Sequence, residues 1–379
     1  MRSTQRTWSR CLSARTSMLA FVCLPLALQS SAPPLYTPRA IRDAYRKGTR
    51  SPDGRPGPKY WQNRARYAIT VSAMPPERAV RGSEQLTYSN NSPDTLKSLV
   101  IKLFLNIHKP GAPRIGGADD DYLTSGVHID AFSVNGQATA WPEAGAFTSQ
   151  RVALPSPLLP HDSVRLGFDW HYEISKQSNR EGMIDSTTFF LAYFYPRVAV
   201  YDDYNGWDRM DFTDQQEFYS DFNDYDVTVR VPANYVVWGT GTLLNPEAVL
   251  QPEYLRRFQS SFTSDQTIHV ATRAELAAKR VTLQSPVNSW RFRADNVPDM
   301  AFGISDHYVW DAGSVLVDDA THRRASVQAR RTMTRRPTTA TWSSSDATPS
   351  TGYLTTGRAS RTRMKRPPSS RDLPEWNIP

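Results

Sequence analysis

The 379-residue sequence is nearly free of cysteine: Cys11 and Cys23 are the only two, and both lie at the extreme N-terminus. If that segment is removed, the mature chain has no thiol, which excludes disulfides and cysteine-based zinc sites. No His-Glu-x-x-His motif occurs, and no two histidines pair at i, i+4 spacing, so a helical zinc site is absent. The spacing of the residues supports no catalytic triad either. We therefore assign no catalytic, cofactor-binding or metal-ligating residue. The histidines are His108, His128, His161, His171, His269, His307 and His322.

A basic face is also missing from the part of the chain that we expect to fold. The formal net charge is +8, but residues 60–322 carry 22 basic and 32 acidic residues, a net charge of −10. The positive charge belongs to the two ends, residues 1–59 and 323–379. Because nucleic-acid binding needs a basic patch on a folded surface, we expect no nucleic-acid partner.

Long hydrophobic runs are confined to the N-terminus. Arginines precede the apolar run from Met18 to Leu28, and Ser30, Ser31 and Ala32 follow it. This is the pattern of a signal peptide, and we expect residues 1–32 to direct export to the periplasm or the extracellular space. An uncleaved anchor is the alternative, but the run is short for a bilayer and contains Pro25, so we expect no stable membrane span.

What the sequence has in abundance is alternation of apolar and polar residues. Such period-two patterns indicate strands with one buried and one wet face, as in antiparallel sheets. Asn135-Gly136 indicates a hairpin, and a helix is expected only at Arg273 to Lys279. The fold class predicted is all-β, a sandwich or a large curved sheet. The buried positions expected from the alternation are Tyr67, Ile69, Val71; Leu99, Ile101, Leu103, Leu105; Val164, Leu166, Phe168, Trp170, Tyr172; Tyr225, Val227, Val229, Val231; Trp290, Phe292; and Met300, Phe302, Ile304.

Composition divides the chain into four parts. Residues 1–32 are the expected signal peptide, and the Pro- and Gly-rich residues 33–59 read as an arm laid across a surface. Residues 60–322 form the β-domain. Residues 323–379 lose the apolar periodicity and, dominated by Arg, Thr, Ser and Pro toward the end, predict a disordered basic tail.

Three short motifs have a functional and a structural interpretation. His128-Ile129-Asp130 could place two metal ligands on one strand face, but a solvated face is favoured. Asp119-Asp120-Asp121 lacks the spaced ligands of a calcium loop, so a solvated loop is favoured. Gly239-Thr240-Gly241 lacks the helix and third glycine of a nucleotide loop and indicates a turn or bulge.

The most aromatic stretch of the chain surrounds Asp202-Asp203. Aromatic rings with carboxylates line substrate sites when exposed and form the core when buried, and the sequence leaves both interpretations open. The rings are Phe189, Phe190, Tyr193, Phe194, Tyr195, Tyr201, Tyr204 and Trp207.

Four stretches resemble the alanyl aminopeptidase (aminopeptidase N) family of zinc metallopeptidases, particularly its secreted bacterial members. Their order and spacing carry the resemblance, which spans about residues 54–321. The stretches are GRPGPKYWQN at 54–63, GSEQLTYSNNSPD at 82–94, the segment from FYPR at 194–197 through VYDD, GW and EFY to YDV at 225–227, and FRADNVPDMAF at 292–302.

The resemblance implies a saddle-shaped antiparallel β-domain that frames the substrate cleft of a separate zinc-binding domain. In the intact family, zinc on His-Glu-x-x-His and a downstream Glu activates water for release of the N-terminal residue of a peptide. A Gln or Glu of the β-domain usually contacts the substrate amine. Residues 187–197 of this chain contain neither, so that role is not assigned, and the aromatic run could replace it.

The tail has a second interpretation, as an out-of-frame reading. If the proper frame takes the third base of each codon with the next two, Pro374 to Pro379 permit Gly-Met-Glu-Tyr-Pro, a hallmark of the family's catalytic domain. Ser360 to Lys365 permit Pro-Tyr-Pro-Tyr-Glu, an element found just upstream in the family. A genuine low-complexity tail is the alternative.

These observations predict a truncated zinc aminopeptidase that is exported and inactive alone. Two alternatives stay open: a secreted β-domain that binds peptide or carbohydrate without catalysis, and a β-domain whose zinc domain is supplied by a second polypeptide.

Overall fold

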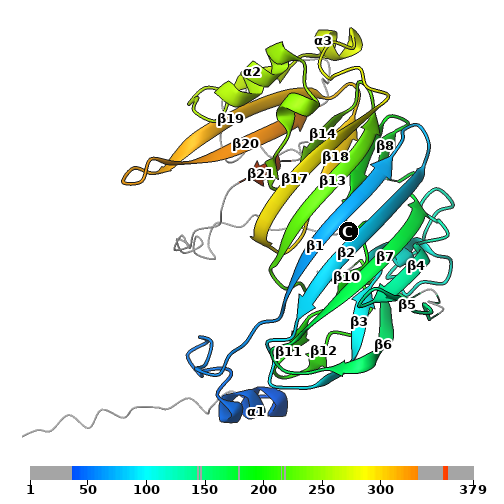
Figure 1. Ribbon diagram of the computed structural model, residues 1–379, viewed down its shortest axis with the longest axis vertical. Helices are drawn as coiled ribbons and strands as arrows, with labels where there is room; N and C mark the ends of the chain where they lie inside the picture. Colours follow the sequence, from blue (N-terminus) through cyan, green and yellow to red (C-terminus); the bar gives the residue numbers. More distant parts are fainter. Residues whose placement is uncertain are drawn as a thin grey trace, which may run out of the picture.

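The computed structural model describes residues 36–142, 145, 147–177, 180–214, 216, 219–331 and 353–356. The predicted signal peptide, residues 1–32, lies outside them. The fold is all-β, as predicted, with strands arranged in several sheets (Figure 1). None of the described helices is long and apolar enough to cross a membrane.

The largest sheet has eight strands and forms one layer of the molecule. Neighbouring strands pair antiparallel, except that β1 and β13 are parallel, which departs from the wholly antiparallel expectation. The order is β15 (Thr242–Leu243), β17 (Val287–Val297), β13 (Asn223–Pro232), β1 (Arg64–Ala73), β2 (Ala79–Ser89), β7 (Ser163–Glu173), β4 (His128–Val134) and β5 (Gln137–Ala138).

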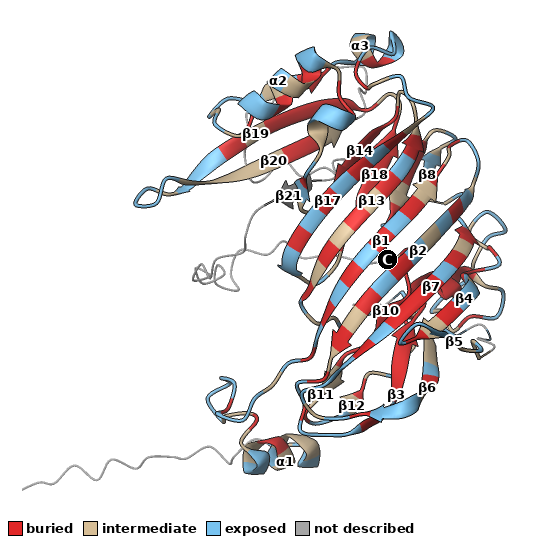
Figure 2. Ribbon diagram, in the orientation of Figure 1, coloured by how far each residue is buried: buried red, intermediate tan, exposed pale blue. Residues whose placement is uncertain are grey.

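Burial along these strands alternates as the sequence predicts, which Figure 2 shows as bands of buried and exposed residues. The turn at Asn135-Gly136 joins β4 to β5, and both residues have positive φ, the conformation that Asn and Gly adopt most easily. Alternation fails from Ser98 onward, because residues 98–102 are all buried and Phe104–His108 then form a fully buried 3₁₀ helix, η1, in place of a longer strand.

Two smaller sheets form the second layer of a sandwich. Trp170 of β7 donates its indole N–H to the carbonyl of Phe194 at 2.8 Å, and the rings of Phe292 on β17 and Phe302 on β18 lie 5.3 Å apart. The side chains between the layers form one continuous core. The sheets are β10 (Arg197–Val198), β3 (Leu96–Lys102), β6 (Ser149–Leu158), and β14 (Val236–Gly239), β18 (Phe302–Ser305), β9 (Thr188–Leu191), β8 (Gly182–Asp185).

A further sheet and two helices lie at one end of the sandwich (Figure 1). Trp310 on β19 joins this part to the core, since its ring contacts those of Trp238, Trp290 and Phe258. The elements are β16 (Ile268–Ala271), β19 (Val309–Asp318), β20 (Arg323–Arg331), β21 (Tyr353–Thr356), η2 (Pro246–Ala248), α2 (Pro252–Ser260) and α3 (Arg273–Ala277).

The helix expected at Arg273 is present as α3, which Thr272 and Glu275 begin with a capping box. The expectation that no other segment is helical is wrong. α2 begins with Pro252 and buries Tyr254 and Phe258, four residues apart. A third helix, α1 (Arg39–Lys47), ends at Gly48 inside the segment interpreted as a Pro- and Gly-rich arm.

The segment interpreted as a disordered tail begins with a strand. β20 pairs with β19 from Arg323 to Arg331, so the boundary expected at residue 323 moves beyond residue 331. The Arg and Ala residues of this segment show no alternation of apolar and polar side chains, so the sequence does not indicate a strand. The strand forms because β19 supplies hydrogen-bond partners for its backbone groups. Residues 332–352 and 357–379 of the predicted tail lie outside the described residues.

Candidate functional site

The stretches that carry the sequence resemblance meet in the structure. The ring of Trp61 stacks on that of Tyr201, 5.7 Å away, which joins the first stretch to the third. The side chain of Asn63 donates to the hydroxyl of Tyr88 at 2.7 Å and accepts the backbone N–H of Asn91 at 2.7 Å. The first stretch is therefore bound to the second as well.

Arg197 joins the third and fourth stretches in the core. Its guanidinium forms a salt bridge with Asp299 and donates to the hydroxyl of Tyr195 at 2.9 Å and to that of Ser220 at 2.8 Å. The Tyr195 hydroxyl also lies 2.9 Å from Asp299 and 3.0 Å from the hydroxyl of Tyr225. Burial alone would lower the pKa of Arg197, but Asp299 and the neighbouring tyrosines hold it above its ordinary value.

Glu84, from the second stretch, faces the same network without a bonded partner. It is 1% exposed on β2, and neither carboxyl oxygen has a hydrogen-bond partner. Burial raises its pKa well above the ordinary value, while the charge of Arg197 opposes that rise. Burial without a partner therefore favours the protonated form of this carboxyl.

The two adjacent aspartates of the predicted aromatic-acidic region have different roles. Both belong to the hairpin of β11 (Tyr201–Asp202) and β12 (Gly206–Trp207), in which Asp202 ends β11 and Asp203 begins the turn. Asp203 is buried, and Arg50 from the arm donates to it at 2.8 and 3.0 Å. Asp202 accepts the backbone N–H groups of Tyr204 and Asn205 through one oxygen, at 3.1 and 2.7 Å, which stabilises the turn.

A pocket of about 530 Å³ lies beside this hairpin. The hairpin supplies part of the lining, and residues 208–212, Gln216 and Tyr219, which belong to the third resembling stretch, supply much of the rest. The pocket is lined by Lys102, Phe104, Asp202, Tyr204, Asn205, Gly206, Trp207, Asp208, Arg209, Met210, Asp211, Phe212, Gln216 and Tyr219.

Both interpretations of the aromatic stretch apply, each to a different part. Phe189, Phe194 and Tyr195 belong to the core, whereas Tyr204 is 36% exposed at the pocket. Tyr219, which belongs to the third resembling stretch but not to the predicted aromatic-acidic region, is 49% exposed there. The part of the aromatic stretch that is exposed, as a substrate site requires, is thus the hairpin and not the strand β9.

The other two candidate ligand motifs lie on the surface. His128 stacks on His171 with the rings 4.9 Å apart, and Asp130 lies 2.9 Å from His171. Asp121 pairs with Lys176 at 3.1 Å on the surface. Among the described residues, no group of three or more His, Cys, Asp or Glu side chains could hold a metal ion.

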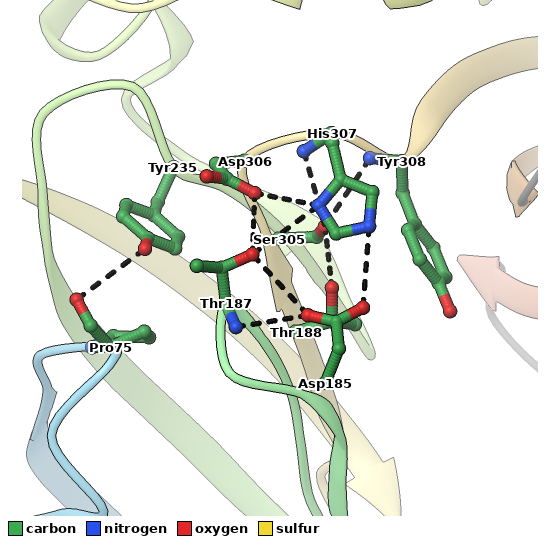
Figure 3. A network of polar contacts seen from close by, with 9 residues as sticks. All are labelled: Pro75, Asp185, Thr187, Thr188, Tyr235, Ser305, Asp306, His307 and Tyr308. Carbon is green, nitrogen blue, oxygen red and sulfur yellow. Dashed lines mark hydrogen bonds and ion pairs between the residues drawn. The ribbon is translucent and has the colours of Figure 1, made fainter.

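A second polar cluster lies at the end of the sheet formed by β14, β18, β9 and β8 (Figure 3). His307 lies between two carboxylates, with Nδ1 2.7 Å from Asp306 and Nε2 3.3 Å from Asp185. Thr187 donates its hydroxyl to Asp306 at 2.8 Å. The buried hydroxyl of Ser305 lies 2.9 Å from that of Thr188.

This cluster links the β8–β9 turn to the segment between β18 and β19. The hydroxyl of Ser305 also accepts the backbone N–H of Tyr308 at 3.3 Å. Because the hydroxyls are buried or already bonded to carboxylates, none is presented to solvent as a nucleophile. We interpret the cluster as a structural connection.

Comparison with known proteins gives a likeness of fold. No family model matches the sequence, and no curated protein matches it. The structure is similar to that of an M1 zinc metallopeptidase from Deinococcus radiodurans, with 13% identity, a TM-score of 0.36, and coverage of 69% of this chain and 45% of that chain. A mutant of that enzyme bound to a Tyr-Ser-Ala substrate gives 13% identity, a TM-score of 0.39, and coverage of 78% and 53%. The chain therefore spans about half the length of these proteins.

Proposed function

We propose that this chain is the β-domain of a zinc aminopeptidase of the alanyl aminopeptidase family, separated from its catalytic domain and inactive alone. The observation that carries the proposal is the mutual contact of the four resembling stretches. Trp61 and Asn63 bind the second and third stretches, and Arg197 binds the fourth through Asp299. Residues that resemble a family in sequence and also contact one another indicate a shared structural unit rather than a chance match.

Inactivity follows from the residues that the chain contains. The intact family holds zinc on His-Glu-x-x-His and a downstream Glu, and this sequence has no such motif. The described side chains do not fit a zinc ion either, since no three ligands are gathered. In the proposal, peptide substrate and zinc belong to the intact protein, and this chain only frames the cleft.

The proposal includes a change of reading frame near residues 325–335. One structural feature supports it: the guanidinium of Arg330 on β20 lies over the ring of Phe190, 3.8 Å from its centroid, and its Nη1 has no hydrogen-bond partner. The cation–π contact offsets part of the cost of burying this charge, but no carboxylate of the described residues pairs with it, and an unbonded buried Nη1 is disfavoured in a selected sequence. A residue read from the wrong frame has not been selected for its site.

Export is the remaining part of the proposal. A charged segment followed by the apolar run Met18 to Leu28 should direct the chain across the membrane, with cleavage near residues 28–32. Mass spectrometry of the exported chain should then find no peptide containing Met18 or Cys23. Recovery of either would contradict this part alone.

The experiment that tests the function compares two chains. The chain as written should bind no stoichiometric zinc and release no product from aminoacyl anilides. A gene in which a one-base change near codons 325–335 restores the proposed frame should encode Pro-Tyr-Pro-Tyr-Glu, Gly-Met-Glu-Tyr-Pro and a zinc-binding helix, and its product should gain both properties. One tightly bound zinc in the original chain, or a stop codon early in the restored frame, would overturn the proposal.

A further inference from the structure

The pocket beside the β11–β12 hairpin contains a carboxylate, Asp202, that forms no salt bridge with the described residues, although it interacts with the charge of Arg50. One oxygen of Asp202 stabilises the turn, and the other has only a 3.5 Å contact with the hydroxyl of Tyr219. Of the other acids, Asp208 pairs with Lys102 at 3.0 Å, and one oxygen of Asp211 accepts two backbone N–H groups. Asp202 differs from Asp211 in that its second oxygen lies beside the exposed aromatic side chain of Tyr219.

A second carboxylate adds to the negative charge. Asp221 lies outside the pocket lining and is partly buried, and the side-chain amide of Gln62 donates to it at 3.4 Å. Burial raises the pKa of Asp221 to about 7, opposed by Gln62 and assisted by the charge of Asp202. A neighbouring cation would therefore favour the ionised form of Asp221 and be favoured by it.

The same surface already binds one guanidinium group. Arg50 lies over the ring of Tyr204, with its guanidinium carbon 4.7 Å from the ring centroid, and is held by the carboxylate of Asp203. An aromatic ring and a carboxylate together are the usual environment of a bound arginine. On the pocket side of the hairpin, Tyr219 and Asp202 form a second pair of a ring and a carboxylate, near enough to Arg50 to favour its charge.

We propose that the pocket binds the guanidinium group of an arginine side chain, with the carboxylate of Asp202 and the exposed ring of Tyr219 as its contacts. Arg209 also lines the pocket and is exposed, so it opposes a cation, while Lys102 is neutralised by Asp208. The binding is therefore weak and depends on ionic strength. This inference rests on the pocket and is independent of the proposed reading frame.

Calorimetric titration of the full chain tests the inference with Gly-Arg-Gly as the probe. The matched probe is Gly-citrulline-Gly, which keeps the shape and loses the charge. We expect the arginine peptide to bind about tenfold more tightly than the citrulline peptide, and its affinity to fall with added salt. Asp202→Asn, which keeps the turn-stabilising oxygen, should weaken arginine binding by about fivefold.

Two variants separate local from general effects. Glu247→Gln removes one exposed negative charge outside the pocket, in η2, and should leave the affinity unchanged. Tyr219→Leu removes the ring and should weaken binding by about threefold. Equal binding of the two peptides overturns the inference without any variant, as does absence of binding or equal binding of Gly-Lys-Gly. An Asp202→Asn protein that unfolds at the wild-type temperature and binds normally also overturns it.

Discussion

Two guanidinium groups covered by aromatic rings, Arg197 and Arg330, have opposite surroundings. Arg197 lies 5.1 Å from the ring centroid of Tyr195 and is bonded to Asp299, Tyr195 and Ser220. Arg330 lies over Phe190 and against Gly303, where even a Cβ atom would approach Nη1 to 1.4 Å. No carboxylate of the described residues pairs with it, and burial lowers the pKa of Arg330 to about 10.

The two sites differ in how well the side chain suits its surroundings in the fold. At Arg197 the charge, the hydroxyls and the carboxylate come from three separate segments and satisfy one another, which is the signature of a selected core network. At Arg330 an apolar residue would fit the site better than the residue present. The side chains thus suit the fold through the β-sandwich, and this fit ends on β20, close to the proposed frame change.

The largest effect is expected at Arg197. Arg197→Met should lower the free energy of unfolding by about 3–5 kcal/mol, because it leaves Asp299 and the tyrosine hydroxyls without their donor. Urea denaturation measures the change. Arg291→Met is the control, since it breaks an exposed pair with Asp226 on the same sheet and should leave the unfolding midpoint unchanged. Equal effects of the two substitutions would remove the distinction on which the comparison depends.

The next effect concerns the unpaired acid beside Arg197. Glu84→Gln should raise the free energy of unfolding by about 1–3 kcal/mol at neutral pH, because the wild-type carboxyl must keep its proton to remain buried. Its pKa is raised on folding, so its stabilising contribution is complete below the unfolded pKa and is lost as pH rises toward the folded pKa. The gain of the variant should therefore increase with pH above the unfolded value.

Stability curves recorded from acid to mildly alkaline pH measure this difference. A variant curve parallel to that of the wild type would show that Glu84 does not titrate on folding. A variant less stable than the wild type at neutral pH would show that the ionised carboxylate contributes to the network.

The smallest effect, and of opposite sign to that at Arg197, is expected at Arg330. Arg330→Met should raise the free energy of unfolding by about 1 kcal/mol, because it replaces an unpaired charge with an apolar chain that packs on Phe190. Differential scanning calorimetry of the full chain measures it. Destabilisation comparable to that at Arg197 would mean that Arg330 belongs to its site, and the structural support for the frame change would be lost.

Much of the sandwich could be predicted because each long strand buries one face. Tyr67, Ile69 and Val71 reveal β1 through local alternation alone. The helix α2 was missed although Tyr254, Leu255 and Phe258 have helical spacing after a helix-starting Pro252, a signal that nine residues carry only weakly. The strand β20 was missed because its side chains do not alternate in polarity and its existence depends on β19.

The pocket could be predicted only in part. Asp202 and its aromatic neighbours stand out because they are adjacent in sequence. Lys102 comes from another segment, and no local pattern brings it to the hairpin. Its relevance arises from its burial and from its pairing with Asp208, which only the tertiary structure shows.

The parallel pairing of β1 with β13 has a consequence for the order of folding. β1 hydrogen-bonds to β2 through a short local turn, but its other edge waits for residues 224–230, about 150 positions later in synthesis. Contacts so distant in sequence make folding slow, and an edge strand that stays open during that time can pair with another chain. In a nascent chain that ends within β7, β1 is thus an exposed edge strand. It becomes a central strand of the sheet only when β13 has been synthesised and pairs with it.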